Sequence, residues 1–81
     1  MANDSTDILH TIAKIVEEVV GVDSAEVTTE KSFTDDLDID SLSMVEITVV
    51  AEDRFAVKIP DDLVTELRTV GDVVSYIADH R

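Results

Sequence analysis

A serine at position 41 follows an acidic stretch, and these residues have the types and spacing that could do chemistry. Three aspartates alternate before it: Asp36, Asp38 and Asp40. A catalytic serine needs a general base within hydrogen-bond reach and a third group that orients this base. The only histidines lie at positions 10 and 80, and no glycine-lined nucleophile elbow surrounds Ser41. The pattern therefore predicts a protein that is not an enzyme, with a hydroxyl at Ser41 that other proteins modify.

The surroundings of Ser41 favour an anion that is held covalently. A phosphodiester on its hydroxyl would lie at the positive end of the helix that follows, near free backbone N–H groups. The aspartates before it would repel a free phosphate, so a noncovalent phosphate site fits less well. A second interpretation stays open at this point, because a serine at a helix start commonly does no more than satisfy backbone donors.

The alternating aspartates also resemble the start of a calcium-binding loop. An EF-hand loop that begins at Asp36 requires glycine at its sixth position and glutamate at its twelfth. The sequence has Ser41 and Ile47 there, so we expect no specific metal site and only weak binding of divalent cations. If these carboxylates lack partners, their crowding should raise their pKa values in the folded protein.

The net charge of −13 restricts the partners of the protein. Nineteen acidic side chains against six basic ones repel nucleic acid phosphates and anionic lipid surfaces, so we expect neither as a ligand. Proteins with basic patches, or cations, are the expected partners. Acidity can also serve solubility alone. Its concentration just before Ser41 favours a role in recognition.

The composition predicts one small domain that spans residues 1–81. An apolar content of 44% is enough for a folded core, and two glycines and one proline argue against all-β turns. The absence of cysteine excludes disulfides, thiolate zinc ligation and cysteine nucleophiles. Without a signal-peptide pattern or an apolar segment of membrane-spanning length, we expect a cytoplasmic monomer with no membrane insertion.

The elements that must position Ser41 are helices, according to the spacing of the apolar residues. The first helix has Gly21 as its C-cap and an apolar stripe at spacings of three and four: Ile8, Ile12, Ile15, Val16 and Val19. Asp40 can cap the second helix, which runs from Ser41 to about Phe55. The connection over residues 22–40 is long, as functional or disordered loops are. Four apolar residues favour a loop that is pinned to the core: Val27, Phe33, Leu37 and Ile39.

Two more helices are predicted in the C-terminal part. Pro60 and Asp61 lead into a short helical turn over about residues 61–66. Thr69 and Asp72 have the spacing of a capping box and open a last helix, with the apolar stripe Val70, Val73, Val74 and Ile77. No strand signal or internal repeat is present. The prediction is an all-α antiparallel four-helix bundle with three principal helices, one short third helix and a long loop between the first two.

The second helix has more apolar surface than a small core can use. One stripe consists of Met44, Ile47, Ala51 and Phe55. A second stripe lies around the helix from it, between Glu46 and Glu52: Leu42, Val45 and Val49. Apolar residues inside an acidic rim are typical of a docking surface, so we expect the second stripe, both glutamates and the aspartates before Ser41 to bind partners. In a narrow bundle both stripes could instead be buried.

Several of these segments together resemble the acyl carrier protein family. Asp40-Ser41-Leu42, entered through Asp36-Leu37-Asp38-Ile39, is similar to the modification motif of that family. There the serine bears a 4′-phosphopantetheine arm, whose terminal thiol holds acyl groups as thioesters. The similarity covers nearly the whole chain and extends to Lys31-Ser32-Phe33, Glu46, Glu52, Val57-Lys58-Ile59-Pro60-Asp61 and Thr69-Val70-Gly71-Asp72-Val73. Residues 41–46 are most similar to actinobacterial carriers of dissociated (type II) fatty acid synthesis.

The resemblance implies that Ser41 carries covalent 4′-phosphopantetheine and presents growing acyl chains to fatty acid synthesis enzymes. The implied partners are a phosphopantetheinyl transferase and acyltransferase, ketosynthase, reductase and dehydratase enzymes with basic docking patches. Two alternatives stay open: a carrier for a polyketide or very-long-chain (mycolic-type) pathway, and an acidic helical interaction module without a covalent cofactor. Very-long-chain carriers often have a long C-terminal extension, and the sequence ends at Arg81, which favours the ordinary fatty acid carrier.

Overall fold

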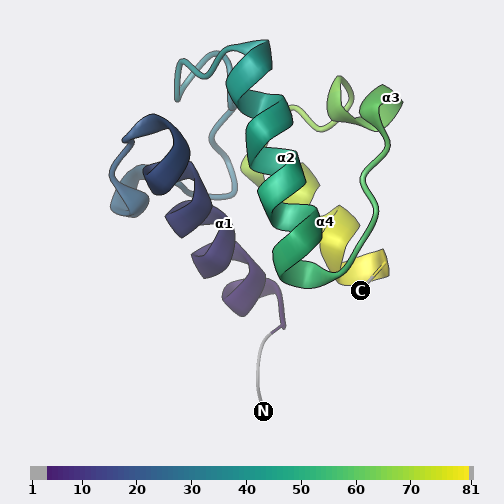
Figure 1. Ribbon diagram of the computed structural model, residues 1–81. Coiled ribbons are helices and arrows are strands. Elements are labelled where there is room, and N and C mark those ends of the chain that lie inside the picture. Colours follow the sequence, from purple (N-terminus) through teal and green to yellow (C-terminus); the bar gives the residue numbers. More distant parts are fainter. Residues whose placement is uncertain (1–3, 81) are drawn as a thin grey trace.

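The computed structural model describes residues 4–80, and within that range every regular element is a helix. The elements in chain order are α1 Asp4–Val20, the 3₁₀ turn η1 Ser24–Glu26, α2 Ser41–Phe55, α3 Asp61–Val64 and α4 Val70–His80. Helix α1 packs against α2 and α4, and it runs opposite to α2 (Figure 1). The short α3 contacts α2 on the side away from α1. The predicted all-α antiparallel four-helix bundle, with a short third helix, is confirmed.

The helix ends follow the predicted capping residues. Gly21 has φ +80°, and its N–H donates to Glu17 O at 2.9 Å, which closes α1 in the way that a C-cap glycine does. Thr69 and Asp72 form a reciprocal capping box at the start of α4. Thr69 Oγ1 accepts from Asp72 N, and Asp72 Oδ2 accepts from Thr69 N, each at 3.2 Å. These caps fix where the long connections leave the helices.

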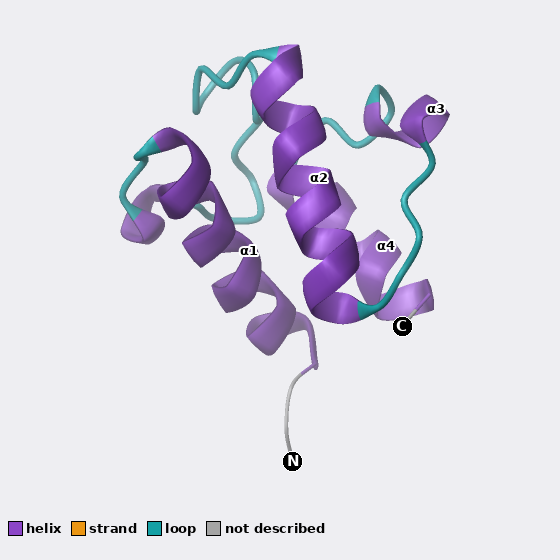
Figure 2. Cartoon of the chain, in the orientation of Figure 1, coloured by secondary structure: helices purple, strands orange, loops and turns teal. Residues whose placement is uncertain are grey.

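The loop between α1 and α2 is pinned to the core, as its apolar residues predict (Figure 2). All four predicted anchors are buried: Val27, Phe33, Leu37 and Ile39. They join one apolar cluster with the inner faces of the three long helices. Burial of these side chains offsets the conformational entropy that an ordered loop of this length costs. The loop therefore presents its aspartates from a fixed backbone.

A seam of backbone hydrogen bonds joins this loop to the start of α4. It consists of one isolated antiparallel bridge between Ser32 and Thr69 and three hydrogen bonds of 3.0 Å, Phe33 N to Arg68 O, Val70 N to Lys31 O and Gly71 N to Thr29 O. A Cβ on Gly71 would lie 3.0 Å from Thr29 O, so a larger residue would push the backbone of the two segments apart. The seam was not predicted, because neither segment has a strand pattern.

Two boundaries differ from the prediction. Helix α3 ends at Val64 and not near residue 66, because Glu66 N donates to Leu63 O at 2.8 Å and tightens the turn. The turn η1 lies inside the segment that was predicted as loop, where Asp23 Oδ1 accepts from Ala25 N at 3.0 Å. Across residues 4–80, no helix combines the length and the apolar character needed to cross a membrane.

Candidate functional site

Ser41 is the first residue of α2, and its side chain is exposed. The capping of the helix is performed by its neighbour. Asp40 Oδ1 accepts from Ser43 N at 2.8 Å, and Asp40 O accepts from Met44 N at 3.0 Å. Within residues 4–80 no hydrogen bond involves the Ser41 hydroxyl. The interpretation of Ser41 as a mere helix cap is therefore wrong, and its hydroxyl is free to react.

The two histidines lie on other helices than the one that begins with Ser41. His10 is exposed on α1, and His80 lies at the end of α4. The His80 ring stacks on Tyr76 with ring centroids 4.1 Å apart, and its Nδ1 lies 2.9 Å from Tyr76 O. Neither histidine is hydrogen-bonded to Ser41. Over residues 4–80, no group of three or more histidine and carboxylate side chains could hold a metal ion.

The acidic stretch before Ser41 is ordered by its own hydrogen bonds. Asp36 Oδ2 accepts from Ser32 N at 2.7 Å, while Ser32 Oγ accepts from Asp35 N at 3.2 Å. Asp38 adopts φ +55°, a conformation that aspartate tolerates better than most residues. Asp36, Asp38 and Asp40 are all exposed. The loop thus combines exposed negative charge with a defined backbone.

The pKa of Asp40 is lower than its ordinary value of 3.8, because the Ser43 backbone N–H, and then its side chain, donate hydrogen bonds to the carboxylate. The prediction that crowding raises the pKa is wrong at this residue. A depressed pKa means that the ionised form stabilises the fold. This contribution is present above the pKa of the unfolded chain and is lost as the pH falls through the folded pKa.

This linkage predicts a difference between two variants at position 40. In Asp40→Asn the amide oxygen accepts the same hydrogen bond and does not titrate, so its melting temperature should fall less than that of the wild type as the pH drops below 3.8. Asp40→Ala removes the acceptor and should lower the melting temperature already at neutral pH. Thermal melting followed by circular dichroism at several pH values measures both effects. Parallel curves for the wild type and the Asn variant would contradict the assignment.

The second apolar stripe of α2 is exposed, as predicted for a docking face. Leu42 is 79% exposed, Val45 44% and Val49 55%, and Glu46 lies exposed among them. Ser43 and these four residues line a shallow hollow on the surface of the helix. The opposite stripe is core: Met44, Ile47 and Ala51 are buried, and Phe55 is half-buried. The alternative in which both stripes are buried is therefore wrong.

Glu52 has a structural contact that the sequence does not indicate. Its Oε2 accepts from the backbone N–H of Ile59 at 2.6 Å, and its side chain is half-buried. This bond ties α2 to the segment that leads into α3. The predicted role of Glu52 in partner binding stays a prediction, and its carboxylate is less available for that role than the exposed Glu46.

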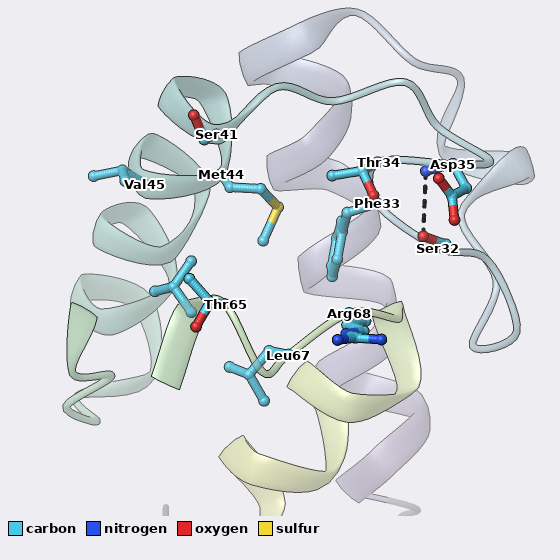
Figure 3. A pocket seen from close by; sticks show the side chains of 11 residues that line it. Ser32, Phe33, Thr34, Asp35, Ser41, Met44, Val45, Thr65, Leu67 and Arg68 are labelled. Carbon is cyan, nitrogen blue, oxygen red and sulfur yellow. Dashed lines mark hydrogen bonds between the residues drawn. The ribbon is translucent and has the colours of Figure 1, made fainter. Parts of the chain in front are cut away.

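A pocket opens beside Ser41, with a volume of about 490 Å³ (Figure 3). Its walls come from α2, from the loop before α2 and from α3 with the segment that follows it. Ser41 lies at one end, and Met44, Val45, Val64 and Leu67 supply most of the apolar wall. The sequence did not reveal this pocket, because it depends on how the seam holds two distant segments. The apolar Val64 and Leu67 around the short helix were the one available signal.

Comparison with known proteins supports one family. Residues 10–77 match the family model described as "Phosphopantetheine attachment site". The chain is 60% identical over 77 residues to an acyl carrier protein of Thermobifida fusca, covering 95% of this chain and 98% of that protein. It is 61% identical to the meromycolate extension acyl carrier protein of Mycolicibacterium smegmatis, covering 78% of that protein. A solved structure of an acyl carrier protein from Enterococcus faecalis superposes with a TM-score of 0.80 at 30% identity, covering 98% of this chain and all of that one.

Proposed function

Because the chain belongs to the acyl carrier protein family, we propose that it carries acyl groups as thioesters on a 4′-phosphopantetheine arm attached to Ser41. The observation that supports this site most directly is the free, exposed hydroxyl at the start of a helix that Asp40 already caps. The arm supplies a terminal thiol, which a chain without cysteine cannot provide itself. The protein is a carrier and not a catalyst of its own.

The residues around Ser41 fit the attached group. The phosphodiester would lie at the N-terminus of α2, where the backbone dipole favours an anion. Because the hydroxyl has no competing hydrogen bond within residues 4–80, a transferase can reach it without disturbing the fold. The adjoining pocket offers an acyl chain shelter from water, since Met44, Val45 and Leu67 line it and Ser41 lies at its edge.

We propose that the exposed stripe Leu42, Val45 and Val49 docks the partner enzymes, with Glu46 and the aspartates before Ser41 facing their basic side chains. The partner classes are a phosphopantetheinyl transferase and the acyltransferase, ketosynthase, reductase and dehydratase enzymes of type II fatty acid synthesis. Long-range attraction to acidic groups speeds association, and a small docking face allows rapid release. A carrier that visits several enzymes in turn needs both.

Reversal of one charge tests the docking face. Glu46→Lys changes the local charge by two units, so kcat/KM of the transferase should fall roughly tenfold at low ionic strength, because basic patches are then repelled. Higher salt should reduce the difference from the wild type. Steady-state kinetics of the transferase and of one elongating enzyme measure the effect.

The matched control is Glu17→Lys, which makes the same charge change on the exposed surface of α1. This variant should lose much less activity with both enzymes. Equal losses in the two variants would show that net charge, and not the face on α2, governs association. Thermal stability of Glu46→Lys should hold, since the side chain is exposed.

Intact mass spectrometry tests the proposed function directly. After incubation with a phosphopantetheinyl transferase and coenzyme A, the protein should gain the mass of one arm. An unchanged mass would favour the alternative, an acidic interaction module without a covalent cofactor. The cytoplasmic location and the extent of the carrier domain, residues 1–81, stay predictions of the sequence.

The choice of pathway is the finer part of the proposal. We favour the carrier of ordinary fatty acid synthesis, because the relatives from Thermobifida fusca and Acidothermus cellulolyticus, which are 60% and 57% identical, are named acyl carrier protein without a more specialised role. The relatives named for meromycolate extension are 61–63% identical to this chain and support the alternative. A carrier for a very-long-chain or polyketide pathway is the alternative. Loading assays with the synthases of each pathway separate them.

A further inference from the structure

The pocket beside Ser41 has a polar end that the proposed function does not use. Opposite Ser41, the side chains of Ser32 and Arg68 lie beside Phe33, with Asp35 at the edge (Figure 3). The rest of the wall is largely apolar. A pocket that only shelters a saturated chain gains nothing from a guanidinium group and a hydroxyl at one end, because hydrocarbon cannot hydrogen-bond to them.

The backbone at this end is fixed, whereas the Arg68 side chain is exposed and the Ser32 side chain is half-buried. Arg68 O accepts from Phe33 N at 3.0 Å within the seam, and Arg68 N donates to Asp72 Oδ2 at 3.2 Å. The guanidinium itself has no hydrogen bond or ion pair within residues 4–80. Ser32 Oγ accepts from Asp35 N, and within the same range no acceptor is bound to its own proton. Both side chains line the pocket and carry donors that no acceptor within residues 4–80 takes up.

We propose that this polar end binds a neutral oxygen atom on the acyl chain, a hydroxyl or a ketone, so that the pocket favours oxygenated over saturated acyl groups. The proposal rests on the proposed function, in which the arm on Ser41 holds the chain beside the pocket. An oxygen that enters an apolar pocket loses its water and needs a donor there. Asp35 also lines the pocket, and its negative charge repels a second carboxylate. A neutral oxygen therefore fits better than the free acid of a dicarboxylic acyl group.

The test compares three acyl groups on the complete protein. Wild type, Arg68→Met and Lys14→Met are loaded with hexanoyl, 3-hydroxyhexanoyl and malonyl groups, and intact mass confirms each loading. The rate at which hydroxylamine cleaves the thioester, divided by the rate for the same acyl pantetheine in solution, reports shielding by the pocket. Lys14→Met is the matched control, because it also removes one exposed positive charge, on α1, outside the pocket.

In the wild type, the 3-hydroxyhexanoyl group should be shielded about two- to tenfold better than the hexanoyl group, which is the range that one net hydrogen bond provides. Arg68→Met should remove this difference and retain shielding of the hexanoyl group, because methionine keeps the wall apolar. Lys14→Met should behave like the wild type. Amide NMR shifts at Ser32 and Arg68 should change with the 3-hydroxyhexanoyl group and not with the unloaded arm.

Other results would overturn the inference in distinguishable ways. An equal preference in Arg68→Met would show that Arg68 does not bind the oxygen. Shifts at Ser32 and Arg68 caused by the unloaded arm would assign these donors to the arm and not to the acyl group. Stronger shielding of the malonyl group would assign them to a carboxylate. A protein that gains no arm in the mass spectrum would overturn the proposed function itself, before any rate is measured.

Discussion

Ser41→Ala should abolish loading by a phosphopantetheinyl transferase completely and leave the helical content of the protein unchanged. The loss is complete because no other atom can replace the hydroxyl as the point of attachment. The fold survives because Asp40 Oδ1 keeps its hydrogen bond with Ser43 N, and the Ser41 side chain makes none within residues 4–80. Intact mass measures the loading, and far-ultraviolet circular dichroism measures the helicity.

Ser43→Ala is the matched control for this experiment. Ser43 lies on the same turn of α2, two residues further on, and the substitution keeps the backbone N–H that Asp40 caps. This variant should be loaded like the wild type. Peptide mapping of the loaded wild type should find the arm on Ser41. An arm on Ser43, or an arm that persists in Ser41→Ala, would refute the assignment.

Phe33→Ala should cause the largest loss of stability among single substitutions in the loop before α2. The side chain is 1% exposed, lies in the core cluster and forms part of the pocket wall. Truncation of a buried phenylalanine typically costs about 3–5 kcal/mol. Small domains have only about 5–15 kcal/mol in total, so the variant should be close to unfolding. Urea denaturation followed by circular dichroism gives the free energy of unfolding.

The comparison variant is Phe55→Ala at the end of α2, where the phenylalanine is only half-buried. Its loss should be clearly smaller, because less apolar surface returns to water. Because both variants replace phenylalanine with alanine, the difference between their losses of stability reports the effect of burial alone. If Phe33→Ala lost no more stability than Phe55→Ala, the loop would be less firmly pinned to the core than its burial indicates.

Local patterns in the sequence were sufficient to predict the helices and the position of Ser41. The bounds of α2, Ser41–Phe55, follow from a capping aspartate and an apolar stripe, and both are signals within a few residues. The burial of Phe33 and Ile39 could also be predicted, because an apolar residue in a polar loop needs a place in the core. The exposed face of α2 could be predicted because the helix has two apolar stripes, and a small core can use only one of them.

Contacts between distant segments could not be predicted in this way. The hydrogen bond from Ile59 N to Glu52 depends on how the chain folds back after α2. From the sequence alone, Glu52 is expected to be an exposed acidic residue like its neighbours. Arg68 enters the pocket wall only because the seam brings its backbone to Phe33. Neither contact is indicated by the spacing of apolar residues or by a capping motif in the surrounding sequence. Such positions depend on tertiary packing, which the spacing of residues along one helix does not encode.

The seam also determines how this protein can diversify. It joins residues 29–33 to residues 68–71, and Ser41 and the exposed stripe of α2 lie on the length of chain that it closes. We call that length of chain the excursion, because it leaves the frame that α1 and α4 form and returns to it at the seam. Sequence changes within the excursion can alter cargo and partners, provided that the inner face of α2 stays apolar, while the frame keeps its backbone bonds. A change at Gly71 instead strains the point where the excursion begins and ends. Selectivity can thus change through substitutions in the excursion while α1, α4 and the seam stay the same.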